Sequence, residues 1–92
     1  MNAPMSESNQ SPHQRLLVLV DRVLERPPGA APLPTKVRLN ELGMSSMKMI
    51  NLMLAIEVEF DVTIPQADIT PDNFDTIASV QALLDRLLGS DG

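Results

Sequence analysis

The chain has 92 residues, of which 43% are hydrophobic and 21% are charged, and this length allows one small globular domain and excludes a two-domain enzyme. It contains no cysteine, which excludes disulfides, thiolate zinc sites and cysteine nucleophiles and favours a reducing cytoplasm. The longest apolar run, residues 16–20, is too short to cross a bilayer, and the first ten residues lack the features of a signal peptide. We therefore expect a cytoplasmic protein without membrane insertion.

The net charge of −5 is divided unevenly along the chain. Residues 1–48 carry six basic and four acidic residues, whereas residues 49–92 carry Arg86 as their only basic residue and eight acidic ones. The acidic half repels a phosphate backbone, and the two aromatic residues, Phe60 and Phe74, provide no stacking platform for bases, so we expect no nucleic-acid binding. A basic protein partner fits this charge better.

A first helix is expected to begin at Ser11, after a flexible tail of residues 1–10. Ser11 can cap the helix, Pro12 suits its first position, and Gln14 completes a capping box. A proline-rich connection, residues 27–43, follows the helix. The apolar face expected on this helix consists of Leu16, Leu17, Val20, Val23 and Leu24.

The second helix is expected to begin near Ser45 and Ser46. Its apolar residues recur at three- and four-residue intervals on two adjoining faces, so we predict that it is the most buried helix. One face consists of Met47, Ile50, Leu54 and Val58, and the other consists of Met49, Met53, Ile56 and Phe60.

A short third helix is predicted after Thr70, with Pro71 at its first position, and Thr76 is predicted to cap the last helix, which ends at Gly89. The sequence therefore predicts an all-α fold, a bundle of three long helices and one short helix with a long loop between the first two. We expect the domain to span residues 11–88, to be monomeric and to be followed by a tail of residues 89–92. The apolar face of the last helix consists of Ile77, Val80, Leu83, Leu84, Leu87 and Leu88.

The residues that could perform catalysis do not cluster. His13 is the only histidine and is expected to be a solvated residue in the first helical turn. Glu57 and Asp61 lie four residues apart, but no Asp-rich loop accompanies them, so a solvated acidic face is favoured over a metal site. The glycines form no phosphate-binding pattern. We therefore expect that the protein is not an enzyme.

The most informative stretch is residues 39–65, LNELGMSSMKMINLMLAIEVEFDVTIP. Taken alone, its serine pair indicates only a helix cap. The stretch nevertheless closely resembles the phosphopantetheine-attachment region of acyl carrier proteins, in which L-x-x-L-G-x-D-S-L precedes a helix ending in E-x-x-F and then I-P. The resemblance extends over residues 11–88 and implies the helical bundle of that family. The positions in register with this pattern are Leu39, Leu42, Gly43, Ser46, Met47, Glu57, Phe60, Ile64 and Pro65.

The resemblance implies that Ser46 receives a 4′-phosphopantetheine arm from coenzyme A, whose thiol then holds an acyl group as a thioester. Gly43, Ser45 and Met47 surround this position, and two of them depart from the family pattern: Ser45 replaces an aspartate and Met47 replaces a leucine. Since Ser45 can still cap the helix but brings no charge, we expect altered recognition by the phosphopantetheinyl transferase. The other expected partners are a loading ligase and downstream pathway enzymes.

Three functions are compatible with these residues. The first, which the sequence favours, is a freestanding acyl carrier in a specialised pathway of lipid or secondary-metabolite biosynthesis. The second is an aminoacyl carrier, because the serine pair, the L-M-L-A-I-E run and the spacing from Pro65 to Phe74 are similar to those of stand-alone carriers charged by ligases related to class II aminoacyl-tRNA synthetases. The third is a helical adaptor without a prosthetic group, in which Ser46 is only a cap.

Four residues are candidates for partner docking. Met44 and Met47 either fill the core or present an adaptable apolar surface to successive partners. Glu57 and Glu59 form either a solvated acidic face or a docking stripe for basic patches. We predict partner docking at these four residues.

Overall fold

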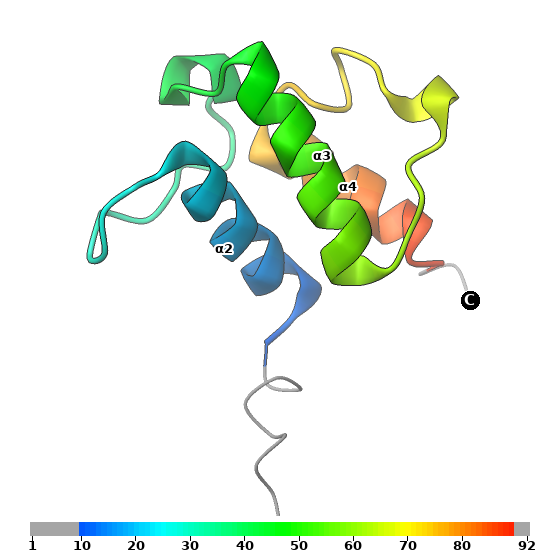
Figure 1. Ribbon diagram of the computed structural model, residues 1–92, viewed down its shortest axis with the longest axis horizontal. Helices are drawn as coiled ribbons and strands as arrows, with labels where there is room; N and C mark the ends of the chain where they lie inside the picture. The colour runs from blue at the N-terminus through cyan, green and yellow to red at the C-terminus, as the bar shows by residue number, and fades with distance from the viewer. Residues whose placement is uncertain (1–9, 90–92) are drawn as a thin grey trace, which may run out of the picture.

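The computed structural model describes residues 10–89, which form an all-helical fold, so the predicted fold class is confirmed (Figure 1). Within these residues there is no β-strand, only an isolated antiparallel bridge between Arg38 and Thr76. The predicted tails fall almost wholly on residues 1–9 and 90–92, which lie outside the described residues. The elements are the α-helices α2 (Pro12–Leu24), α3 (Ser46–Phe60) and α4 (Ile77–Leu87) and the 3₁₀-helices η1 (Leu39–Leu42) and η2 (Gln66–Asp68).

Helix α2 begins with the predicted capping box. The Ser11 hydroxyl accepts a hydrogen bond from the backbone N–H of Gln14 at 3.2 Å, and the Gln14 side chain accepts one from the Ser11 N–H. The helix ends at Leu24, before the prolines, because Glu25 adopts a left-handed conformation with φ +60°. The left-handed residue Glu25, and not Pro27, therefore ends the helix.

Helices α2 and α3 pack side by side, with the start of α2 next to the end of α3 (Figure 1). Arg15 joins them: its Nε donates to Glu59 Oε2 at 2.9 Å, and its Nη2 donates to the Glu59 carbonyl at 2.8 Å. The Arg15 guanidinium also lies 4.5 Å from the centre of the Phe60 ring, within reach of a cation–π interaction. Glu59 and Phe60 therefore lie on the side of α3 that faces α2.

The hydrophobic core draws on all three α-helices and on the connections between them, and no polar or charged residue among those described is buried. The helices contribute Leu16, Leu19, Val20, Leu52, Ile56, Phe60, Ile77, Val80, Leu83 and Leu84, and the connections contribute Leu39, Met44, Ile64 and Phe74.

The prediction that α3 is the most buried helix is wrong. Only one side of it is covered, by α2 and the core, while the first predicted face is exposed by 67% at Met47, 50% at Ile50, 56% at Leu54 and 83% at Val58. The two other α-helices of the described region, α2 and α4, are too few to surround α3. We call these four residues the outer stripe.

The short helix predicted after Thr70 is replaced by turns, and η2 forms four residues earlier. Thr70 does cap a turn, since its hydroxyl accepts from the Asn73 N–H at 3.2 Å. The turn does not continue because Asn73 is held elsewhere: its side-chain amide donates to the Asp68 carbonyl at 2.8 Å, and its carbonyl accepts from the Ser79 hydroxyl at 3.0 Å.

No described helix is both long and apolar enough to cross a membrane.

Two backbone hydrogen bonds join the long connection between α2 and α3 to the start of α4. The Leu39 N–H donates to the Asp75 carbonyl at 2.8 Å, and the Ala78 N–H donates to the Thr35 carbonyl at 2.9 Å. Thr76 caps α4 as predicted, because its hydroxyl accepts from the Ser79 N–H at 3.1 Å. The connection therefore leads to the start of α3 along a defined path.

Candidate functional site

The serine pair lies at the start of α3, where the sequence predicts it. Gly43 ends η1 with φ +98°, a conformation that side-chain-bearing residues rarely adopt, and turns the chain toward α3. Ser45 is the N-cap, and its hydroxyl accepts a hydrogen bond from the Lys48 N–H at 3.2 Å. Ser46 is the first residue of the helix and is exposed. One serine therefore caps the helix, and the other presents its hydroxyl to solvent.

The surroundings of Ser46 fit a phosphodiester. Within residues 10–89 its hydroxyl forms no hydrogen bond, so a group attached there breaks no contact of the fold. The first turn of α3 contains no acidic residue. The unpaired N–H groups and the positive end of the helix dipole favour a negative charge at this position.

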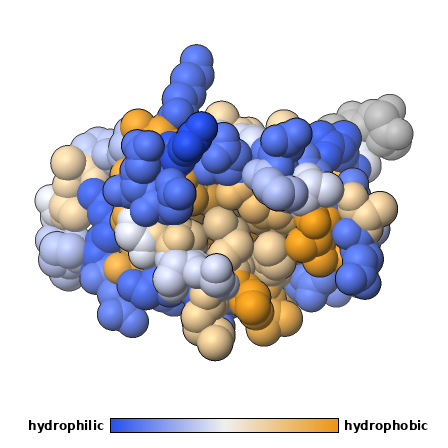
Figure 2. Space-filling model, turned by 90° about the horizontal axis from the view of Figure 1, so that it is seen from above, coloured by the Kyte–Doolittle hydropathy of each residue, from blue (hydrophilic) through white to orange (hydrophobic). Residues whose placement is uncertain are grey.

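A shallow pocket of about 370 Å³ opens directly beside Ser46. Apolar side chains from α3 and from the connection before α4 form most of its wall. The view from above shows apolar surface, tan and orange, over the middle of this end of the molecule, between polar borders (Figure 2). The lining residues are Met44, Ser45, Ser46, Met49, Met53, Ile69, Thr70, Pro71 and Phe74.

The four predicted docking residues differ in their placement. Met47 is 67% exposed and begins the outer stripe, whereas Met44 is 5% exposed and belongs to the core, where it presents almost no surface to a partner. The Glu57 carboxylate accepts a hydrogen bond from the Ile64 N–H at 2.8 Å, and Glu59 pairs with Arg15 at 2.9 Å. Both glutamates thus have structural contacts that the sequence analysis did not foresee.

The outer stripe was not predicted as a surface, because Ile50, Leu54 and Val58 were assigned to a buried helix and only Met47 was a docking candidate. The signal was present in the spacing: Ile50, Leu54 and Val58 recur every four residues on one side, while Leu52 and Ile56 lie on another. Two apolar sides on one helix of a small bundle indicate that one of them is left for a partner.

The described residues offer no catalytic or metal-binding cluster. No three His, Cys, Asp or Glu side chains in residues 10–89 are arranged to hold a metal ion. His13 Nδ1 lies 3.1 Å from Gln81 Oε1, between α2 and α4. The site at Ser46 can therefore accept and display a group, and its residues supply no base or nucleophile beyond the hydroxyl itself.

Comparison with known proteins gives a family match over most of the chain. The family model described as a phosphopantetheine attachment site matches residues 14–87. The chain is 39% identical over 80 residues to aminoacyl carrier protein 1 of Bradyrhizobium diazoefficiens, covering 87% of this chain and 89% of that protein. It is 40% identical over 76 residues to aminoacyl carrier protein 2 of the same organism, covering 83% of this chain and 85% of that protein.

Two solved structures resemble the fold. One is a crystal structure of the Bradyrhizobium japonicum glycine:carrier protein ligase complexed with glycylated carrier protein (TM-score 0.66, 40% identity, 79% of this chain and 99% of that chain). The other contains the ligase with its cognate carrier protein and an analogue of glycyl adenylate (TM-score 0.68, 38% identity, 83% and 99%). Together with the geometry at Ser46, these matches identify the chain as a member of the phosphopantetheine-binding carrier protein family, whose members are not enzymes and carry a covalent 4′-phosphopantetheine group.

Proposed function

We propose that this protein is a stand-alone aminoacyl carrier, in which an amino acid is held on a phosphopantetheine arm attached to Ser46 and is loaded by a dedicated ligase. The observation that carries the proposal is the exposed, unbonded hydroxyl of Ser46 at the first position of α3. The names of the similar proteins support the aminoacyl cargo, and the ligase complexes of the similar structures support the loading partner.

The residues around Ser46 have separate roles in this proposal. Ser45 keeps the start of α3 ordered through its hydrogen bond from Lys48 and leaves the Ser46 hydroxyl free. Gly43 directs the chain so that the serine pair lies at the surface, and Met47, one residue further, lies where an incoming enzyme must pass. When attached, the arm supplies a terminal thiol that binds the amino acid as a thioester.

The acyl carrier of lipid or secondary-metabolite biosynthesis is the second candidate. Its support is the family match, which both kinds of carrier share. The aminoacyl alternative has the additional support of relatives at 39% and 40% identity that bear that name, so we favour it. The helical adaptor has no comparable support.

Modification at Ser46 is tested by intact mass after incubation with coenzyme A and a broad-specificity phosphopantetheinyl transferase. We expect the wild-type protein to gain the mass of one phosphopantetheinyl group. Ser46→Ala should abolish the gain, while the matched control Ser45→Ala should retain it, because the Ser45 hydroxyl holds the capping bond and Ser46 occupies the attachment position of the family pattern. A gain that survives Ser46→Ala would overturn the assignment.

The cargo is tested separately with the modified protein. We expect the Bradyrhizobium japonicum glycine:carrier protein ligase, given ATP and an amino acid, to add one aminoacyl group that hydroxylamine removes, as expected for a thioester. Loading by an acyl-activating ligase with a fatty acid, and by no amino-acid ligase, would instead support the acyl carrier. The unmodified protein is the control in both reactions.

A further inference from the structure

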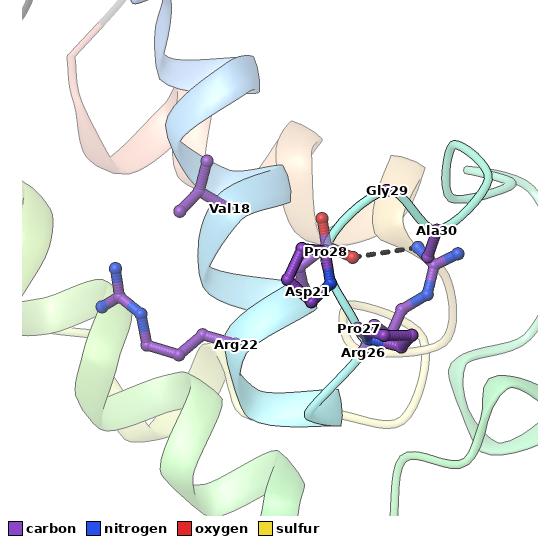
Figure 3. Close-up of a pocket in the computed structure, with 8 residues that line it drawn as sticks. All are labelled: Val18, Asp21, Arg22, Arg26, Pro27, Pro28, Gly29 and Ala30. Atoms are coloured by element: carbon purple, nitrogen blue, oxygen red, sulfur yellow. Dashed lines mark hydrogen bonds and ion pairs between the residues drawn. The ribbon is translucent and has the colours of Figure 1, made fainter.

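The methionines are the only sulfur-containing residues of this protein, which has six of them and no cysteine. Four of the six lie within residues 44–53, around the start of α3, and residues 10–89 contain no other methionine. A second pocket, at the end of α2, has none in its wall, as the eight residues labelled in Figure 3 show. Sulfur is therefore concentrated beside Ser46.

The four methionines differ in their exposure to solvent. Met47 is 67% exposed, whereas Met44 is 5% exposed and packs in the core. Met49 and Met53 are half-buried, and both line the pocket beside Ser46. A small reagent in the solvent therefore reaches the thioether of Met47 more readily than the thioethers of the other three.

Methionine is oxidised at its thioether sulfur by peroxides. The sulfur gains one oxygen atom and becomes a sulfoxide, while the O–O bond breaks and hydrogen peroxide is reduced to water. The reaction converts a flexible apolar side chain into a polar one that binds water. Leucine, which the carrier-protein pattern has at the position of Met47, contains no sulfur and does not react in this way.

Met47 lies where such a change affects the attachment reaction. It follows Ser46 directly in the first turn of α3, and its side chain is apolar and exposed. The phosphate of coenzyme A must come within bonding distance of the Ser46 hydroxyl, so the transferase displaces water from the neighbouring residue as well. Displacing water from a sulfoxide is less favourable than from a thioether, because a polar group that loses its hydrogen bonds is destabilised.

We propose that Met47 is a redox-sensitive modification site: peroxide oxidises its thioether to the sulfoxide before the other three methionines of residues 10–89 react, and the sulfoxide slows attachment of phosphopantetheine to Ser46. The second part rests on the proposed function, because it requires attachment at Ser46. Methionine sulfoxide reductase reverses the reaction, since a dithiol is oxidised to a disulfide and the oxygen atom leaves as water. The modification therefore couples the supply of functional carrier to the level of peroxide.

The first measurement is the rate of oxidation at each methionine. The full-length protein without the arm is treated with dilute hydrogen peroxide, the peroxide is removed with catalase, and the protein is digested with trypsin. Cleavage after Arg38 and Lys48 releases residues 39–48, in which the buried Met44 is an internal control for Met47. Tandem mass spectrometry should show oxidation about tenfold faster at Met47 than at Met44, because susceptibility follows exposure. Oxidation that is no faster at Met47 than at the other three overturns the proposal.

The second measurement is the rate of phosphopantetheine attachment, started after the peroxide has been removed because coenzyme A carries a thiol that peroxide also oxidises. We expect oxidation at Met47 to lower this rate by about threefold or more. Reductases for both sulfoxide epimers should restore it. Met47→Leu should show the same rate before and after peroxide treatment, whereas the matched control Met53→Leu, which keeps Met47, should stay sensitive.

Thermal unfolding separates the proposal from damage to the fold. Because the Met47 side chain lies outside the core, the oxidised and untreated proteins should unfold at the same temperature, and a lower temperature after oxidation overturns the proposal. An attachment rate that is independent of oxidation at Met47, or that falls equally in Met47→Leu, also overturns it while attachment itself stands. If the untreated protein receives no phosphopantetheine, the proposed function fails together with the effect on attachment, and the peptide map alone decides whether Met47 is the favoured oxidation site.

Discussion

The two sides of α3 have similar composition and opposite surroundings. Leu52, Ile56 and Phe60 lie in the core, while Leu54 and the rest of the outer stripe face solvent, although all recur at helical spacing. The pattern of a sequence shows which residues share a side of a helix. Which side is covered depends on the neighbouring elements, and here the side with Leu52, Ile56 and Phe60 packs against the core that α2 and α4 help to form. One side of this helix therefore contributes to the core, and the other leaves apolar residues exposed.

The largest effect is expected on the inner side. Leu52→Ala should lower the free energy of unfolding by about 2–5 kcal/mol, because the side chain is fully buried and leaves a cavity. Phe60→Ala and Leu84→Ala should fall in the same range. Urea denaturation of each variant measures the change, and a loss below about 0.5 kcal/mol would show that the sides are wrongly assigned.

A smaller effect is expected at the helix start, where the two sides meet. Ser45→Ala should lower the unfolding free energy by about 1 kcal/mol, because the Lys48 N–H loses its acceptor. Ser45→Asp should keep the cap and add about 0.3–1 kcal/mol through the helix dipole. Thermal unfolding of Ser45→Ala and Ser45→Asp checks the expected loss and the expected gain of stability. Equal stability of the two variants would contradict the capping role.

The Arg15 contact should contribute less, because its side chain and that of Glu59 are 33% and 39% exposed and solvent screens the pair. Arg15→Ala should lower stability by about 0.5–1 kcal/mol, part of it from the contact with the Phe60 ring. A double-mutant cycle with Glu59→Gln isolates the ion pair. A coupling free energy of zero would mean that Arg15 acts through its hydrogen bond to the Glu59 carbonyl and through the ring contact.

The smallest effect on stability is expected on the outer side. Leu54→Ala should change the unfolding free energy by less than about 0.5 kcal/mol, because the side chain is 56% exposed. The Kd of the Leu54→Ala variant for the loading ligase should nevertheless rise by about tenfold if Leu54 lies in the centre of the interface. Calorimetric titration gives the Kd, and unchanged binding would separate the outer stripe from ligase docking.

The sequence predicts the local features of this fold well. The capping box at Ser11, the start of α3 at Ser46 and the cap at Thr76 all depend on residues within three positions of each other, and the structure confirms them. The candidate attachment residue needed more than a local signal, because the serine pair alone indicates only a cap, and it was identified from the fixed spacing of the family pattern around this helix start.

Properties that depend on distant residues were not predicted. Met44 is buried although it adjoins the exposed serine pair, because it packs in the same pocket as Phe74 from the other end of the chain. The helix expected after Thr70 does not form, because Asn73 bonds to Asp68 and Ser79 instead. At Met44 a tertiary contact overrides the local signal, whereas after Thr70 competing bonds to residues five and six positions away do so.

The bonds between the long connection and α4 have a consequence for local unfolding. The Leu39 and Ala78 amides donate across this junction to residues far away in sequence, so neither bond can break without loosening both segments. Hydrogen exchange at these two amides should therefore proceed through one shared opening. Since the connection leads directly into η1 and the serine pair, the same opening would release the start of α3 from its fixed direction. Order at the attachment site is thus coupled to the first turn of the last helix.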